Sequence, residues 1–382
     1  MKDFFRKIIP ARRDAVMLAV LLILSGVLFF TNLLPAGNPE EGTKEKAVVL
    51  AVDNSNITEY ASLYRGSQIL EVRVLSGKYK NKVFRASNEL RAQMELDKLF
   101  KVNDIVLVGI MHGANPETDT VNAQDHYRIS NTFWLFGLFV LLLVCFGGFT
   151  GICALLSFVF SCLVIWKLVI PLTLAGYNAI LISLAAVLLL SVVIILLVAG
   201  LSRKGFAALA GAFAGVLAAA FTGWFFTGLF KINGAVMPYA QSLLNSGYEY
   251  LKLSDIFIGA IFLSSSGAVM DLAMDVASGI EEISLHNPAL KFKDLFKSGI
   301  RIGRSVVGTM TTTLLLAYSG GYLTLMMMFA AQGTGPVDFI NNPYVASETV
   351  KTLVGSFGLV LVAPLTAFVS ALIFSREKNS RN

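Results

Sequence analysis

Two carboxylates stand four residues apart in an otherwise apolar stretch of the chain. The segment SSSGAVMDLAMDVASG, residues 264–279, holds Asp271 and Asp275. Because four residues make about one helical turn, both side chains project from the same face of a helix. A carboxylate inside a membrane costs roughly 2.5–3.5 kcal/mol on insertion scales, so such acids pair, bind a cation or line a wet cavity. The spacing predicts a cation- or proton-binding face, with the deeper Asp271 as its centre.

Hydroxyl side chains offer further oxygen ligands for such a site. Ser264 lies about two helical turns before Asp271, on the same face. The next apolar segment, RIGRSVVGTMTTTLLLAYSGG, places Thr309, Thr312 and Ser319 at helical spacing. The paired glycines that follow can break a helix and free backbone carbonyls as ligands. The alternative is packing, because Ser and Thr hydroxyls commonly bond to carbonyls within and between membrane helices.

Two arginines at the start of that second segment give Asp275 a competing role. Arg304 of an antiparallel neighbour would reach about the depth of Asp275, with Arg301 three residues earlier. A buried ion pair between Asp275 and Arg304 would fix helix packing, or gate and neutralise the acid. Asp271 lies beyond easy reach of either arginine, so packing explains it less well.

The elements that position these residues are membrane-spanning helices. The chain is 55% hydrophobic and only 15% charged, against roughly a quarter charged in soluble proteins. Uncharged windows near 20 residues long predict transmembrane helices. We expect a polytopic α-helical membrane protein with about eight spans, at residues 15–34, 133–150, 152–171, 177–199, 205–229, 255–278, 303–328 and 350–374.

Basic residues predict the orientation of these spans. They precede the first span and recur at 202–205, between 291 and 304, and in the tail SREKNSRN. Since cytoplasmic loops carry the excess of Lys and Arg, both termini are expected in the cytoplasm. The predicted organisation is an N-terminus and anchor helix at 1–35, an extracytoplasmic β domain at 36–131, seven helices at 132–375 and a tail at 376–382.

The expected β domain is a small barrel of the OB or SH3-like kind. AVVLAVDN, QILEVRVLSGKYKNKVFRAS and NDIVLVGI are short β-branched runs broken by turn residues, with a turn around Gly77. Its last loop holds His112 and Asp119 and ends at His126. These residue types can bind a metal, but in a polar loop they are more often solvated, so no metal is assigned. The domain could bind an extracytoplasmic protein partner.

Several other classes of function are excluded or disfavoured. The net charge of +6 comes from basic residues beside apolar segments, which indicates anionic lipid rather than nucleic acid. The sequence contains no GxxxxGK[ST], HExxH, GxSxG or CxxC motif, so neither an enzyme nor a cofactor is expected. GAFAG at 211–215 is typical of close helix packing. Residues 280–299 are expected to form a short amphipathic segment at the cytoplasmic headgroup boundary.

The two segments that carry the polar residues resemble the YibE/F-like family of multi-pass membrane proteins. The matching residues are Gly267, Ala268, Met270, Asp271, Ala273 and Met274, then Gly308, Thr309, Met310, Leu314, Leu315, Leu316, Ala317 and Tyr318. Asp275 stands where relatives carry small or hydroxyl residues, which sets it apart from a shared mechanism. The resemblance covers roughly 130–375 and implies a protein of the bacterial cytoplasmic membrane, without a reaction to carry over.

Two functions fit these observations best, and a membrane-embedded enzyme ranks third. The first is a transporter or permease, ion- or proton-coupled, for a small ion or small molecule, with a site between the sixth and seventh spans. The second is a membrane-anchored accessory or assembly protein whose β domain binds a partner and whose buried polar groups only pack. Replacement of Asp271 by asparagine separates them, because an accessory protein should tolerate it far better.

Overall fold

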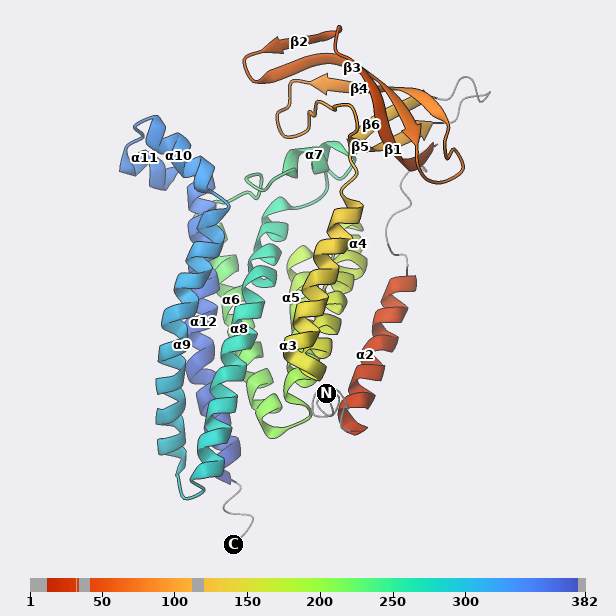
Figure 1. The fold of residues 1–382 in the computed structure, drawn as a ribbon. Helices are drawn as coiled ribbons and strands as arrows, with labels where there is room; N and C mark the ends of the chain where they lie inside the picture. The colour runs from red at the N-terminus through yellow and green to blue at the C-terminus, as the bar shows by residue number, and fades with distance from the viewer. Residues whose placement is uncertain (1–11, 32, 34–41, 112–119, 377–382) are drawn as a thin grey trace. The chain divides into compact units, whose positions relative to one another are not determined.

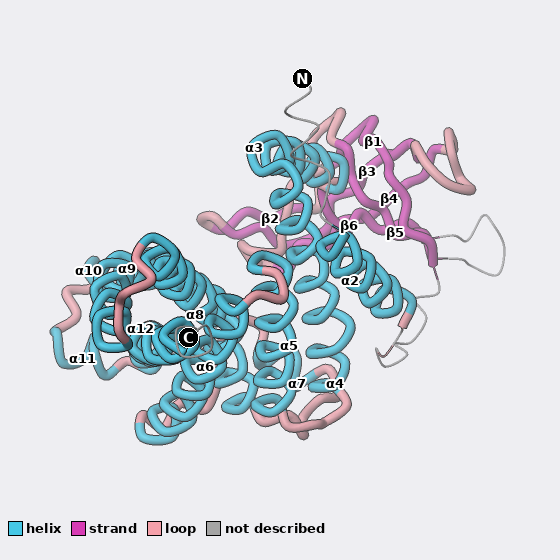
Figure 2. The backbone as a smooth tube through the Cα atoms, turned by 90° about the horizontal axis from the view of Figure 1, so that it is seen from below, coloured by secondary structure: helices cyan, strands magenta, loops and turns pink. Residues whose placement is uncertain are grey.

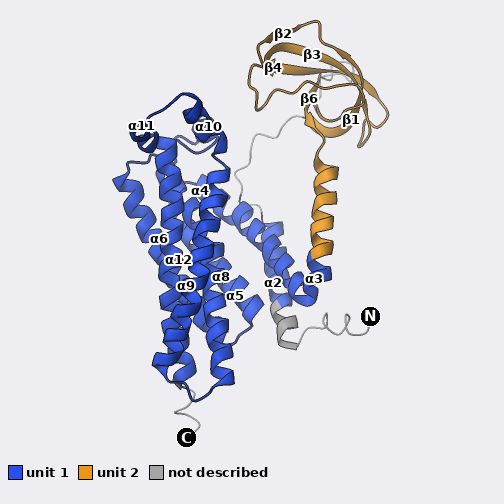
Figure 3. Ribbon diagram, turned by 60° about the vertical axis from the view of Figure 1, so that its left-hand side comes forward, with its two compact units in different colours: residues 1–35, 143–382 blue, residues 36–142 orange. Residues whose placement is uncertain are grey.

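The computed structural model describes residues 12–31, 33, 42–111 and 120–376, which form two compact units (Figures 1 and 3). One unit comprises residues 36–142 and is a β-barrel with the start of the helix that follows it. The other comprises residues 1–35 and 143–382 and is helical.

The barrel is a ring of five strands with a sixth strand attached outside it. The strands are β1 (Gly42–Asp53), β2 (Ile57–Tyr60), β3 (Leu63–Val74), β4 (Val83–Arg91), β5 (Ile105–Met111) and β6 (Thr120–His126). Neighbours follow the order β1-β5-β6-β4-β3, and β3 pairs again with β1 to close the ring. Among the described strands, β2 pairs only with β3, and β4–β6 is the one parallel pair. The predicted barrel is confirmed.

Alternating apolar residues explain why these segments close into a barrel. In β3 and β1 every second residue points inward, and Leu70, Val72 and Val49 are fully buried. The turn between β3 and β4 requires glycine. Gly77 has a φ of 67°, and an added Cβ would lie 1.6 Å from Oε1 of Glu45.

A buried amide fixes the long connection between β4 and β5. Gln68 is fully buried; its Nε2 donates to the carbonyl of Phe100 at 3.0 Å, and its Oε1 accepts from the Phe100 amide at 3.0 Å. Nδ2 of Asn88 donates to the same Oε1 at 3.0 Å and to the carbonyl of Lys98 at 2.7 Å. A satisfied network of this kind holds the connection in one conformation.

Asp125, at the end of β6, makes the barrel's stability depend on pH. Its carboxylate lies 2.7 Å from Nη1 of Arg128 and 3.2 Å from Nζ of Lys98. Partial burial raises the pKa of Asp125, but the hydrogen bonds from Arg128 and Lys98 outweigh it and hold the pKa below its ordinary value. The stabilisation is therefore present above the unfolded value of about 3.9 and is lost as the pH falls through the lower folded value.

We expect Asp125→Asn to speed amide hydrogen exchange in β6 at neutral pH but not at the acid limit. Comparing variant and parent at each pH cancels the intrinsic pH dependence of exchange. Glu89→Gln is the control, because Glu89 and Arg91 are 68% and 73% exposed and such pairs contribute little. A difference of the same size at both pH values would refute the pKa argument.

The helical unit packs around α8. Its elements and the helix that enters it are α2 (Arg12–Phe30), α3 (Ile129–Val164), the π-helix η2 (Ile165–Val169), α4 (Ile170–Leu174), α5 (Ala179–Ala199), α6 (Arg203–Leu229), α7 (Ala240–Asn245), α8 (Leu253–His286), α9 (Phe292–Gly320), α10 (Leu323–Ala331), α11 (Pro336–Asn341) and α12 (Pro343–Arg376). α8 contacts α5, α6, α9 and α12, and Figure 2 shows α6, α8, α9 and α12 gathered together end on.

Fewer helices qualify as spans than the sequence predicts. In the described part of the chain, five helices are long and apolar enough to cross a membrane, or six if the pair α9 and α10 forms one bent span. The predicted spans 133–150 and 152–171 fall in one apolar stretch, Ile129–Leu174, interrupted at Gly148, where φ is 55° and ψ is −127°. In α2 the described side chains begin at Leu18, and Leu18–Phe30 forms a shorter apolar helix. The structure supports membrane-type helices but not the count of eight.

The amphipathic segment predicted at 280–299 does not lie apart from the helices. α8 continues to His286 and α9 begins at Phe292, so both helices absorb it. Leu295 is only 1% exposed, and Ile283, Leu290, Phe292 and Phe296 pack against the helical core. Leu285, in contrast, is largely exposed, at 68%. These side chains therefore belong to the packed ends of α8 and α9 and do not form a separate helix.

Candidate functional site

One face of α8 is open and carries both carboxylates. Ser264, Gly267, Asp271 and Asp275 are exposed, while the intervening positions pack against α5, α6 and α12. Neither carboxylate has a hydrogen-bond or ion-pair partner in the described part of the chain. An added Cβ at Gly267 would meet no atom within 4 Å. We call this row of four residues the α8 face.

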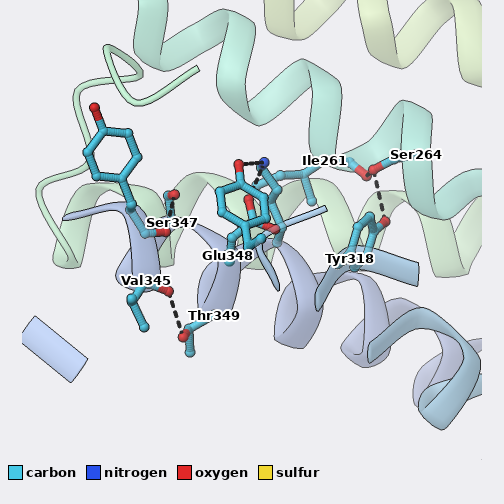
Figure 4. Close-up of polar contacts among 10 residues, drawn as sticks. Ile261, Ser264, Tyr318, Val345, Ser347, Glu348 and Thr349 are labelled. Atoms are coloured by element: carbon cyan, nitrogen blue, oxygen red, sulfur yellow. Dashed lines mark hydrogen bonds and ion pairs between the residues drawn. The ribbon is translucent and has the colours of Figure 1, made fainter. Parts of the chain in front are cut away.

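α9 lies antiparallel beside the α8 face. Oη of Tyr318 donates to Oγ of Ser264 at 2.9 Å (Figure 4). Nearer the other end of the two helices, Ile302 packs against Gly279. Interpolating between these contacts places Thr311 near the depth of Asp271. Since seven residues of helix span about 10 Å, Asp271 lies about that far from the Tyr318–Ser264 hydrogen bond. The site predicted between the two helices is therefore a neighbouring pair of polar faces.

The predicted hydroxyl ligands bond to their own helices. Thr309 donates to the carbonyl of Val306 at 3.0 Å, and Thr312 donates to that of Gly308 at 3.3 Å. Ser319 donates to Leu316 at 3.3 Å. Each hydroxyl proton is thus donated to a carbonyl of the same helix, as the packing alternative predicts. A hydroxyl oxygen that donates its proton retains acceptor lone pairs, so each oxygen remains available to a cation or to water.

The predicted ion pair between Asp275 and Arg304 is not formed. Both residues lie in the described chain, both are exposed, and no ion pair within 4.0 Å joins them. Arg301 is likewise exposed. The ion pair that does link α8 to a neighbour near this end joins Glu281 to Lys204 of α6 at 3.0 Å. Asp275 therefore remains an open carboxylate, as Asp271 does.

The helix breaks at the paired glycines Gly320 and Gly321, as the sequence predicts. α9 ends at Gly320, and α10 leaves it at an angle of 66°. A polar cluster lies beside this bend (Figure 4). Lys351 and Glu348 of α12 form an ion pair and are only 20% and 13% exposed, and Nζ of Lys351 donates to Oη of Tyr322 at 3.4 Å. Lys351 also lies 5.7 Å from the ring centre of Phe257.

A pocket opens between this cluster and the bend. Its volume is about 270 Å³, and its wall is mainly apolar. The polar side chains in the wall include Ser319, Tyr322, Glu348 and Thr352. Of these, sequence reasoning identified only Ser319. Glu348 and Lys351 went unnoticed because Glu348 precedes the predicted span at 350–374, although charges three residues apart at the edge of an apolar run are a readable signal.

The described residues hold no group of three or more His, Cys, Asp or Glu side chains that could bind a metal. His112 and Asp119 lie outside the described residues. His126 is in β6, where its ring packs edge-on against Phe100 with centres 4.9 Å apart. For His126 the structure thus provides a packing role.

Two family models match the chain. One, described as YibE/F-like protein, matches residues 135–376, and the other, described as the YibE/F family N-terminal domain, matches residues 42–126. The first covers the helices that carry the α8 face, and the second covers the barrel. The resemblance seen in the sequence is confirmed. No curated protein and no solved structure matches the chain.

Proposed function

The chain belongs to the YibE/F-like family, and from that premise we propose that it is an ion- or proton-coupled membrane transporter or permease. The site of coupling is the α8 face, with Asp271 at its centre. One observation carries the proposal: Asp271 is a carboxylate without a partner in the middle of a long apolar helix. A protein that used it only for packing would be expected to pair it, since an unpaired membrane carboxylate is costly.

The proposed topology is eight spans with both termini in the cytoplasm. The stretch Ile129–Leu174 has 46 residues, which as a straight helix would be about 70 Å long, more than twice a hydrocarbon core of about 30 Å. The break at Gly148 divides it into two pieces of ordinary span length. α2 with its flanking residues supplies the anchor. In this arrangement the barrel is extracytoplasmic, and the start of α8 lies at the outer surface.

The residues around Asp271 have distinct proposed roles. Asp271 takes up a proton or small cation, and the hydroxyl oxygens of Ser264, Thr309 and Thr312 complete its surroundings. The bend after α9 and the Glu348–Lys351 pair form the outer mouth of the path. Arg304 neutralises or gates Asp275, which no ion pair occupies in the described part of the chain.

The second candidate is an accessory protein whose barrel binds an extracytoplasmic partner. The closed strand order and single parallel pair are those of an OB-type barrel, a fold that binds ligands on its surface. A groove of about 480 Å³ lies where β1 bulges between Val49 and Ala51, and its wall includes Asp53, Glu71 and Arg85. This groove is the observation that favours the second candidate.

The variant Asp271→Asn distinguishes the two candidates. Asparagine keeps the shape and removes the charge, so we expect the protein to fold with unchanged thermal stability while proton- or cation-coupled flux is lost. The measurement is proton flux into liposomes that contain a pH-sensitive dye, driven by an imposed membrane potential, with sodium and potassium tested in turn. Asp255→Asn, in the first turn of the same helix, is the matched control. Flux that persists at the parent rate in Asp271→Asn would support the accessory protein.

A further inference from the structure

The outer face of α9 has no neighbour in the described chain. Gly299 and Gly303 lie on the inner face, where an added Cβ would come within 2.8 Å of Ala367 and 2.7 Å of Ala363 in α12. The opposite side is different in kind. Its exposed residues are Arg301, Arg304, Ser305, Gly308, Thr309, Thr312 and Thr313, and an added Cβ at Gly308 would meet nothing within 4 Å.

Contact of this polar face of α9 with lipid would be energetically unfavourable. Charged and hydroxyl side chains within a span lose their water, and they rarely face hydrocarbon. Small residues and hydroxyls are also the residues through which membrane helices approach one another closely. α9 therefore requires a polar surface opposite it, and its composition suits a second helix.

The chain itself carries the complementary surface. Asp271 and Asp275 are open and acidic, whereas Arg301 and Arg304 are open and basic, on adjacent helices. No ion pair within 4.0 Å joins Asp275 to Arg304 inside one chain. Two copies related by a twofold axis along the membrane normal would place α9 of each copy against α8 of the other. Residues at the same depth in the membrane would then face each other. In a contact of this symmetry, Arg304 of each copy would face Asp275 of the other, so the two equivalent ion pairs would form together.

We propose that a second copy of the chain covers the α8 face and the outer face of α9, and that Arg304 of each copy meets Asp275 of the other. The contact closes Asp271 off from lipid, so the proposed coupling site is complete only in the dimer. This inference deepens the proposed function and rests on it for the role of Asp271. The contact itself requires no transport.

Disulfide cross-linking in liposomes tests the contact. In full-length variants without Cys145, Cys153 and Cys162, we expect chains with Thr309→Cys, mixed with chains with Asp271→Cys, to yield a covalent dimer of the two on oxidation, because the contact places α9 of one copy against α8 of the other. Val360→Cys is the control, because Val360 is 51% exposed on α12, and the Gly303–Ala363 contact places it near the depth of Thr309. Its product should stay monomeric. Equal cross-linking at both positions, or a product of Thr309→Cys that contains another protein, would overturn the proposal.

A charge exchange tests the pairing. Arg304→Asp places like charges together, so we expect the dimer fraction, counted by single-molecule photobleaching, to fall by about tenfold or more. Adding Asp275→Arg should restore it. Loss without restoration, in variants whose thermal stability matches the parent, would refute the Arg304–Asp275 contact. If the charge variants fail to fold, the Thr309 cross-link alone decides. If the Asp271→Asn protein forms dimers and also shows the flux of the parent, the transporter proposal is wrong. The dimer contact is then still supported.

Discussion

Replacing Lys351 by methionine is expected to lower the free energy of unfolding of the helical unit by about 3 kcal/mol. Methionine retains most of the packing of the lysine stem but removes the charge that faces Glu348. Glu348 is 13% exposed, so its carboxylate would remain buried beside the bend without a counter-charge. Breaking a buried pair from one side is costly for this reason, even where the intact pair adds little net stability.

The double variant Lys351→Met with Glu348→Gln should recover much of that loss. It removes both charges, so no unpaired ion remains in the apolar surroundings. The measurement is unfolding by SDS in mixed micelles, followed through a double-mutant cycle. Glu282→Gln is the control, because Glu282 and His286 form a pair that is 68% and 76% exposed and should contribute less than about 1 kcal/mol. Additive losses in the double variant would mean that the two side chains do not interact in the membrane.

The barrel was the more predictable part of the fold. Its strands show apolar residues at every second position, and that pattern survives because one face of each strand is buried. The closure of the ring through β1 and β3 was not readable in detail, since it depends on the bulge between Val49 and Ala51. The role of Gln68 was also hidden. A glutamine within a strand is ordinarily exposed, and only the return of the chain at Phe100 buries it.

The position of the helices was readable from composition, but their ends and rotations were not. Charged residues between 281 and 297 suggested a separate surface segment, yet tertiary packing of Leu295 extends α9 through it. Periodicity placed Asp271 and Asp275 on one face correctly. Depth alone suggested that Arg304 would reach Asp275, but depth leaves the rotation of each helix about its axis undetermined. The inner face of α9 is fixed by Gly299 and Gly303, and this turns Arg304 outward.

The last prediction concerns the contact between α6 and α12, where glycine permits the closest approach. GAFAG places Gly211 and Gly215 on the face of α6 that meets α12, as its spacing predicts. An added Cβ at Gly211 would lie 1.8 Å from Oγ1 and 3.0 Å from Cα of Thr366. Thr366 is fully buried, and its Cα belongs to the backbone of α12, so a change of side-chain rotamer cannot relieve that contact.

Gly211→Val is therefore expected to separate α6 from α12 and to lower the free energy of unfolding by about 3 kcal/mol, the upper end of ordinary overpacking. Gly228→Val in the same helix is the matched control, since an added Cβ there meets nothing within 4 Å. The two substitutions are chemically identical, so the difference between them in SDS unfolding isolates the contact with Thr366. Losses of equal size would show that the contact with Thr366 is not their cause. A loss confined to Gly211 would establish that backbone proximity, which only glycine allows, joins these two helices.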